Sequence, residues 1–291
     1  MLLLDGKGIA ATIRAELAGE IRDLTGKIGR SPGLAVILAG DDKPSQTYVR
    51  NKERACAEIG IESETLRLPA DIGPETLLGL IDSLNVRPDI DGILVQLPLP
   101  GGVDSRACLE RIDPSKDVDG FHPVNMGRLM LGLPGLRPCT PAGVMEMLKR
   151  CALTPAGKRA VVLGRSNIVG KPLAVMLGAK GASADATVTV CHSATPDAAE
   201  YCRNADFVFL AMGKPESVRG DMIKKGAVVV DIGISVTEKG LRGDADFASV
   251  SAVAAAASPV PGGVGPMTIA MLMGNTVQAY KAHAGITQRF T

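Results

Sequence analysis

The sequence predicts an α/β fold in two domains, because short apolar segments alternate with amphipathic segments in two separate series. The first series starts with residues 5–27, whose apolar positions recur every four residues, and with the apolar run 33–40, which ends in glycine as a buried parallel strand does. Residues 113–141 are then dense in Pro, Gly and Asp, and a second series follows. We therefore expect a catalytic α/β domain at 1–120 and a Rossmann-like domain at 121–291, with the active site in the cleft between them.

Each element follows from the spacing of its apolar residues and from its flanking Gly and Pro. Thr140 is the expected N-cap of a helix at 141–151, with Pro141 in its first turn. Residues 249–257 match neither a helix pattern nor a strand pattern. The last helix, at about 267–284, can pack back on the first domain. Further helices are expected at 45–59 and 74–84, and strands at 61–68, 92–98, 160–164, 186–191, 206–211 and 226–231.

Composition excludes several classes of partner. Lys and Arg total 32 against 31 Asp and Glu, so the formal net charge of +1 provides no general attraction to nucleic acid or to an anionic membrane. No apolar run approaches the ~20 residues of a membrane helix, and Asp5 interrupts any signal-peptide core, so we expect a cytoplasmic protein. The six cysteines form no C-x-x-C pair and Cys191-His192 has no matching partner, so no metal site is expected.

The segment Gly164-Arg-Ser-Asn-Ile-Val-Gly170 connects a predicted strand to a predicted helix, as a dinucleotide-binding loop does. Ser166 replaces the middle glycine of the standard fingerprint, so a tight turn without ligand is the alternative, but the strand–loop–helix context favours nucleotide. The next strand ends in Cys191-His-Ser193 without the carboxylate that holds an NAD ribose. Arg165 and Ser193 can instead meet a 2′-phosphate, which favours NADP, while His192 is most simply a packed residue.

Ser45, Tyr48 and Lys52 share one face of a predicted helix, at positions i, i+3 and i+7. A lysine beside a phenol suits proton transfer, because burial lowers its pKa toward neutrality; taken alone, however, a solvated surface pair is the simpler interpretation. Gln96 lies in an apolar strand, where its amide needs a hydrogen-bond partner, and Lys52 is a plausible one. Asp119, in a turn ended by Gly120, can accept two hydrogen bonds from a planar ligand, or it simply forms an Asx-type turn.

A tyrosine and a lysine four residues apart are also found in short-chain dehydrogenases. In that family the glycine-rich loop precedes the Tyr/Lys pair within one sheet, whereas here Tyr48 and Lys52 precede Gly164 by a whole domain. The order of the motifs therefore argues against that family.

Five ordered blocks resemble one family closely, the bifunctional methylenetetrahydrofolate dehydrogenase/methenyltetrahydrofolate cyclohydrolases (FolD). The blocks, which span nearly the whole chain, are Tyr48-Val-Arg-Asn-Lys52 with Cys56 and Gly60, residues 91–100, residues 114–123, residues 164–172 and residues 259–268. One departure is visible, because residues 181–186 form a longer connection than the family pattern has.

The resemblance implies that Lys52 is the main acid/base residue, that Tyr48 orients substrate, that Gln96 tunes Lys52 and that Asp119 anchors the pterin ring. It implies NADP as cofactor and a homodimer, and an activity that oxidises 5,10-methylenetetrahydrofolate and hydrolyses the methenyl product to 10-formyltetrahydrofolate. Ser45 joins the implied folate residues. The other implied contacts are Pro261 and Gly262 in a loop over the folate, and Gly164, Arg165, Ser166, Ser193 and Ile234 around NADP.

Two other functions remain open from the residues alone. The nucleotide half by itself would suit an NADP dehydrogenase of another small substrate, and the fold would suit an NADP-binding regulator without chemistry. The presence of Tyr48, Lys52, Gln96 and Asp119 together argues against both. The sequence does not determine the ratio of the two activities, the direction of flux, the dimer interface or the strictness of NADP over NAD.

Overall fold

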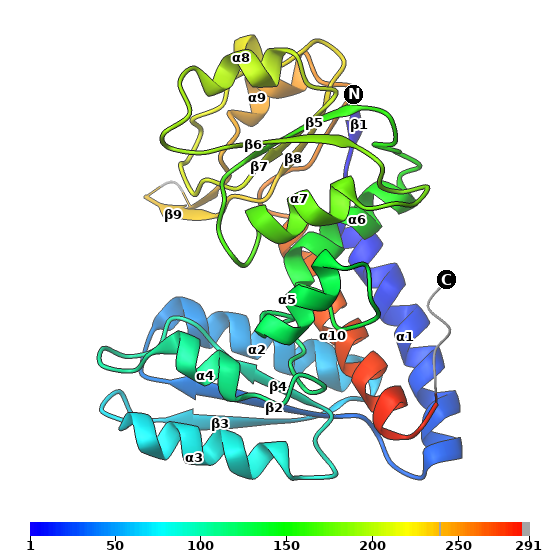
Figure 1. The fold of residues 1–291 in the computed structure, drawn as a ribbon, viewed down its shortest axis with the longest axis vertical. Helices are drawn as coiled ribbons and strands as arrows, with labels where there is room; N and C mark the ends of the chain where they lie inside the picture. Colours follow the sequence, from blue (N-terminus) through cyan, green and yellow to red (C-terminus); the bar gives the residue numbers. More distant parts are fainter. Residues whose placement is uncertain (239, 287–291) are drawn as a thin grey trace. The chain divides into compact units, whose positions relative to one another are not determined.

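The structure is a computed structural model that describes residues 1–238 and 240–286 (Figure 1). These residues divide into two compact units, each made of two stretches of chain. Unit 1 comprises Met1–Ala11 and Thr140–Met271, and unit 2 comprises Thr12–Cys139 and the chain from Leu272 onward. The predicted functional domains, 1–120 and 121–291, stay a prediction.

Unit 2 is built on a small parallel sheet with strand order β3-β2-β4. All seven residues of the central strand β2 (Gly33–Ala39) are buried, as expected for an apolar parallel strand covered on both faces. Beside it lie β3 (Glu62–Leu68) and β4 (Gly92–Val95). The helices are α1 (Gly6–Ile28, in this unit from Thr12), α2 (Lys43–Ile59), α3 (Pro74–Asn85), α4 (Ser105–Arg111), α5 (Pro123–Met130) and the end of α10 (Val264–His283).

Unit 1 contains a six-stranded sheet of order β1-β11-β8-β7-β5-β6, parallel throughout. The chain runs from β5 outward to β6 and then returns to β7 on the other side of β5, which is the topological switch point where doubly wound sheets bind ligands. The strands are β1 (Leu2–Leu3), β5 (Arg159–Leu163), β6 (Thr187–Cys191), β7 (Phe207–Leu210), β8 (Val228–Asp231) and β11 (Ala256–Ala257). The remaining elements are α6 (Cys139–Arg150), α7 (Gly170–Gly178), α8 (Ala198–Arg203), α9 (Phe247–Ser251), the 3-10 turn η1 (Gly220–Met222) and the hairpin β9 (Ser235–Thr237) and β10 (Gly240–Arg242).

The predicted elements are present, with three corrections. Thr140 is not the N-cap of α6 but lies inside the helix, where its Oγ1 is 3.0 Å from Oγ1 of Thr268. Gln96 follows β4 rather than lying within it, because the ladder to β2 ends at Val95. The ambiguous segment 249–257 contains the end of α9 and the short strand β11.

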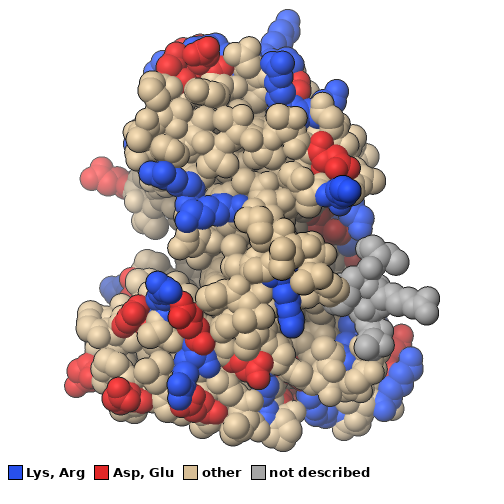
Figure 2. Space-filling model, in the orientation of Figure 1, with Lys and Arg blue, Asp and Glu red and all other residues tan. Residues whose placement is uncertain are grey.

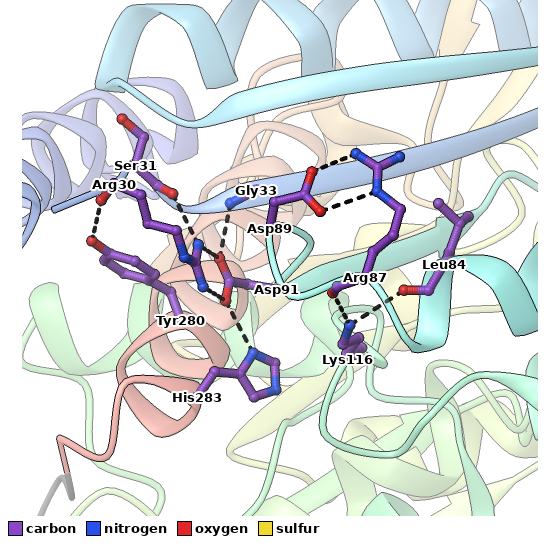
Figure 3. A network of polar contacts seen from close by, with 10 residues as sticks. All are labelled: Arg30, Ser31, Gly33, Leu84, Arg87, Asp89, Asp91, Lys116, Tyr280 and His283. Atoms are coloured by element: carbon purple, nitrogen blue, oxygen red, sulfur yellow. Dashed lines mark hydrogen bonds and ion pairs between the residues drawn. The ribbon is translucent and has the colours of Figure 1, made fainter. Parts of the chain in front are cut away.

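The buried carboxylate of Asp91, just before β4, connects the segment after α1 with the end of α10 within unit 2 (Figure 3). Both oxygens of the fully buried Asp91 are bound by Arg30, at 2.6 and 2.7 Å, and the carboxylate also accepts from the Gly33 amide at 2.9 Å and contacts His283 Nδ1 at 3.0 Å. Burial alone would raise the pKa of Asp91, but the hydrogen bonds from Arg30 and His283 outweigh it and leave the pKa lowered. The Tyr280 hydroxyl donates to the Arg30 carbonyl at 2.5 Å, so α10 is held at two points.

Charged side chains of both signs are interspersed on the face shown in Figure 2, in keeping with the balanced composition. Among the described residues, no helix combines the length and the apolarity needed to cross a membrane. Within the same residues, no three His, Cys, Asp or Glu side chains gather as metal ligands would.

Candidate active site

The helix α2 presents the predicted Ser45, Tyr48 and Lys52. Asp42 caps the helix by accepting from the Ser45 amide at 2.8 Å, and Gly60 ends it in the left-handed region with φ 86°. Ser45 is buried, and its Oγ donates to Asp42 at 2.6 Å, so it braces the start of the helix. Tyr48 is 41% exposed, which leaves its ring open to a ligand.

Lys52 and Gln96 are joined as the sequence predicts. Lys52 Nζ donates to Gln96 Oε1 at 3.0 Å, and Gln96 Nε2 donates to the Leu97 carbonyl at 2.8 Å. The Leu97 carbonyl can only accept, so the Gln96 group that faces it must be the NH₂. The amide oxygen of Gln96 therefore faces Lys52. Gln96 is itself held by its backbone amide, which donates to the Ile37 carbonyl at 2.9 Å. The lysine nitrogen therefore has a fixed position beside a neutral acceptor.

Asp119 lies in the turn between α4 and α5, within reach of the Lys52 charge. Burial raises the pKa of Asp119 to about 6, the Lys52 charge opposes the shift and the Asp117 charge adds to it. Gly120 has φ 74°, and a Cβ there would lie 2.3 Å from the backbone carbon of Arg137, so this turn requires glycine. The half-buried carboxylate is thus held where its charge is poorly solvated and free to meet a ligand.

Two residues that hold this turn were missed from the sequence. Asn275, on α10, donates through Nδ2 to the carbonyls of Val118 and Arg137, at 2.8 Å each, and Cys139 Sγ contacts the Val118 carbonyl at 3.1 Å. An Asn in the largely apolar stretch 267–277 was the available signal, because a buried amide must be hydrogen-bonded. Burial raises the pKa of the Cys139 thiol well above its ordinary value, which disfavours the reactive thiolate.

In unit 1, the predicted dinucleotide loop joins β5 to α7 at the switch point of the sheet. Gly164 has φ 119°, and a Cβ there would lie 2.2 Å from the Ala211 carbonyl oxygen, while a Cβ on Gly170 would lie 2.2 Å from the Gly164 oxygen. Ser166 Oγ accepts from the amides of Val169 and Gly170, at 3.2 and 3.3 Å. Ser166 therefore tightens the turn at the place where the standard fingerprint has glycine.

A pocket of about 370 Å³ opens beside this loop at the carboxyl ends of β7 and β8. Its lining includes Ser166 and Ile234 from the predicted cofactor set, together with Thr140 and Thr268. The other residues predicted for the cofactor do not line this pocket: Gly164 lies in the turn after β5, and Arg165 and Ser193 are exposed. The predicted folate residues Pro261 and Gly262 lie in the loop before α10 and do not line it either. The Gly262 carbonyl accepts from the Lys7 amide at 2.9 Å.

Two buried carboxylates that were missed from the sequence shape one wall of this pocket. Asp231, at the end of β8, accepts from the amides of Gly233, Asp244 and Ala245 at 2.8 to 3.1 Å. Asp244 in turn accepts from the amides of residues 212–214 at 2.6 to 3.2 Å. Burial raises the pKa of Asp231 to about 6, against the effect of these backbone donors. The pair fixes the loops after β7 and β8, which supply pocket residues.

The fold and these residues define a two-unit α/β protein with a Rossmann-type nucleotide-binding unit. The family model described as tetrahydrofolate dehydrogenase/cyclohydrolase, catalytic domain, matches residues 4–119, and the NAD(P)-binding domain of the same family matches residues 138–284. The chain belongs to the tetrahydrofolate dehydrogenase/cyclohydrolase family.

Individual relatives agree over almost the full length. The chain is 66% identical to the bifunctional protein FolD of Nitratidesulfovibrio vulgaris strain DP4 over 286 residues, covering 98% of this chain and 100% of that protein. The crystal structure of the FolD dehydrogenase/cyclohydrolase of Campylobacter jejuni superposes with a TM-score of 0.94 at 50% identity, covering 97% and 99% of the two chains. The Trypanosoma brucei FolD structure, complexed with NADP cofactor and inhibitor, gives 0.91 at 42% identity and 97% coverage of each chain.

Proposed function

We propose that the chain oxidises 5,10-methylenetetrahydrofolate to the 5,10-methenyl compound with NADP and then hydrolyses the product to 10-formyltetrahydrofolate. The observation that carries this proposal is the hydrogen bond between Lys52 and Gln96 near the half-buried carboxylate of Asp119, in a chain that matches both domain models of the family. We infer that residues 1–120 bind the folate and residues 121–291 the NADP.

The residues present fit a dinucleotide. Gly164 and Gly170 let the loop fold tightly, because a Cβ at either position would meet backbone of Ala211 or of Gly164 itself. The loop is thereby held at the switch point of the sheet, beside the pocket at the carboxyl ends of β7 and β8. We propose that Ser166 and Ile234 contact the dinucleotide and that Arg165 and Ser193, both exposed after neighbouring strands, bind the 2′-phosphate. When bound, NADP would supply the acceptor for the hydride of the one-carbon bridge.

The protein's part in the oxidation is to hold the folate. An ionised Asp119 accepts two hydrogen bonds from adjacent N–H groups of the pterin, which orients the ring and returns to the carboxylate the hydrogen bonds that it lost on burial. Tyr48 supplies an exposed ring on the same face of α2 as Lys52 for contact with the substrate. Pro261 and Gly262 complete the proposed folate contacts.

The hydrolysis depends on Lys52. Water adds to the methenyl carbon as one of its protons passes to the Lys52 nitrogen, and the same nitrogen returns a proton to N5 as the C–N5 bond breaks. The remaining hydroxyl proton leaves to solvent as the formyl C=O forms. Gln96 holds Nζ through one of its protons, so the remaining positions on the nitrogen stay available to substrate and water. The same nitrogen therefore acts first as base and then as acid.

The direct test is to incubate the purified chain with 5,10-methylenetetrahydrofolate and NADP and to measure NADPH, methenyl and 10-formyl products separately. Enzyme-dependent formation of NADPH and of 10-formyl product is expected. Accumulation of the methenyl compound at its spontaneous rate of hydrolysis would show a monofunctional dehydrogenase, and no NADPH at all would leave a nucleotide-binding regulator.

We further propose that the chain works as a cytoplasmic homodimer. The outer strand β6 is paired on one side only among the described residues, and its Val190 is 37% exposed, so this edge offers both backbone groups and apolar surface to a second copy. Light scattering should give twice the chain mass, and Val190→Lys should shift it toward the monomer. A monomeric wild type would contradict the proposal.

A further inference from the structure

The loop after β7 turns three successive backbone amides toward one point. Gly213 lies in the left-handed region with φ 66°, and the amides of Met212, Gly213 and Lys214 converge around it. Successive amides that converge in this way form a concavity with a partial positive charge, which binds anions. The loop lies at the carboxyl end of β7, and Gly213 lines the pocket of about 370 Å³ beside the dinucleotide loop.

The anion in this concavity is the side chain of Asp244. Its Oδ2 accepts from the amides of Met212 and Gly213, at 2.6 and 3.2 Å, and its Oδ1 accepts from the amide of Lys214 at 2.6 Å. Asp244 is 0% exposed, whereas Gly213 and Lys214 are exposed, so a buried carboxylate holds the backbone of a surface loop. Among side chains, only an ionised carboxylate presents two oxygens that both accept and do not donate.

The same carboxylate limits the position of the loop after β8. A Cβ on Gly233 would lie 2.3 Å from Cγ and Oδ1 of Asp244 and 2.5 Å from Oδ2, so Gly233 packs directly against the carboxylate. Gly233 lines the pocket together with its neighbours Ile232 and Ile234. One side chain therefore contacts both of the loops that supply this part of the lining.

The backbone of Asp244 is itself held in place by its neighbours. Its amide and that of Ala245 donate to the Asp231 carboxylate, at 3.0 and 2.8 Å, and its carbonyl accepts from the Val218 amide at 2.9 Å. A Cβ on Gly243 would lie 2.0 Å from Oδ2 of Asp231, so the chain before Asp244 is closely packed as well. Because this backbone is fixed from two directions, the two loops take their positions from the Asp244 side chain.

We infer that Asp244 is a positioning residue for the dinucleotide site, because its carboxylate holds the loops after β7 and β8 where they line the pocket. The inference rests on the proposed function, in which this pocket takes NADP. Asp244 does not itself line the pocket, so it acts through the loops and not by contact with the cofactor. A neutral amide of the same shape should therefore weaken the binding of NADP and spare the proposed folate residues of unit 2.

The test titrates the full chain with NADP by calorimetry and measures steady-state kinetics with both substrates. In Asp244→Asn an NH₂ group faces backbone donors, so the Kd and KM for NADP should rise about tenfold or more, while kcat and the KM for 5,10-methylenetetrahydrofolate change by less than about threefold. Asp246→Asn is the matched control, because this neighbouring carboxylate caps α9 by accepting from the Ser249 amide and does not line the pocket. The control should bind NADP as the wild type does.

Unchanged NADP affinity in folded Asp244→Asn would overturn the inference. Equal losses of affinity for NADP and for folate would overturn it too, since they would show a general structural role. A wild-type chain that binds no NADP would refute the proposed function and, with it, this inference.

A second measurement needs no variant. Gly213 and Lys214 are exposed, so their amides should exchange with D₂O quickly unless they donate to Asp244. Hydrogen–deuterium exchange of the wild-type chain, resolved at these two amides, should show protection in the absence of NADP. Exchange as fast as at the exposed Gly101 and Gly102 would contradict the role of Asp244.

Discussion

Replacing Asp119 with Asn should stabilise the protein at neutral pH while it removes the proposed pterin anchor. Burial raises the pKa of Asp119 from 3.8 to about 6, so the folded protein resists its ionisation. A carboxyl group with a raised folded pKa costs no stability below its unfolded pKa; the cost grows as pH rises between the two values and is complete above about 6. Asn has nearly the shape of the protonated acid and escapes this cost.

The expected size follows from the shift. At high pH the shift corresponds to a loss of about 3 kcal/mol in the free energy of unfolding. Between about pH 4.5 and about pH 7.5 this loss changes by about 2 kcal/mol. The side chain retains some contact with solvent, so about 1–2 kcal/mol is the expected pH-dependent gain of Asp119→Asn over wild type. Urea unfolding of both proteins at the two pH values, followed by circular dichroism, measures it.

Asp71→Asn is the control, because Asp71 is exposed and the substitution should change stability little at either pH. Folate affinity, measured by titration on the same proteins, should fall in Asp119→Asn and should fall in wild type as pH drops through about 6. A gain in stability that does not vary with pH would show that the pKa of Asp119 is not raised in the folded protein. A pH-dependent gain with unchanged folate affinity would refute the anchoring role alone.

Three other perturbations give separate expectations. Lys52→Met should abolish hydrolysis of the methenyl compound and impair NADPH formation less, as assayed by product; normal cyclohydrolase activity in a folded variant would disprove the acid/base role. Arg165→Ala should raise KM for NADP by about tenfold or more and KM for NAD much less, and equal losses would remove the 2′-phosphate contact. Asp91→Ala should lower the free energy of unfolding by about 3 kcal/mol in urea denaturation, because it leaves Arg30 and the Gly33 amide without their acceptor; a loss below about 1 kcal/mol would show that the pair is dispensable.

The parts of the site that could be predicted from the sequence are those that depend on residues within one helix or on the cost of burying a polar group. The face that joins Tyr48 and Lys52 follows from helical periodicity, and the bond from Lys52 to Gln96 follows from the cost of an unpaired amide next to an apolar strand. The strand order, by contrast, pairs Leu2 and Leu3 with residues 256–257, and nothing in two leucines at the start of a chain indicates that contact. The N-cap prediction for Thr140 was wrong, because α6 begins one residue earlier, at Cys139. The hydroxyl of Thr140 instead contacts Thr268, which is distant in sequence.

The residues that were missed share a different property: they act on backbone groups and not on ligands. Asn275, Asp231 and Asp244 each bind two or more main-chain groups from other elements, so their role depends on loops whose course the sequence does not specify. A polar residue in an apolar run shows that some partner exists, but it does not say which one. Side chains proposed to carry chemistry are therefore easier to predict from the sequence than the side chains that fix the backbone around them.

The raised pKa of Asp119 connects stability with function. The turn that carries it is fixed by Asn275, by Cys139 and by the close packing of Gly120 on Arg137, so its backbone holds the carboxylate in a half-buried position. Such rigidity costs folding energy in the free protein, and a ligand that supplies paired N–H groups recovers it on binding. If Asp119 is the pterin anchor that we propose, the binding energy gained there depends on the poor solvation of its charge in the free protein, so a carboxylate open to water in the same turn would bind paired N–H groups less tightly.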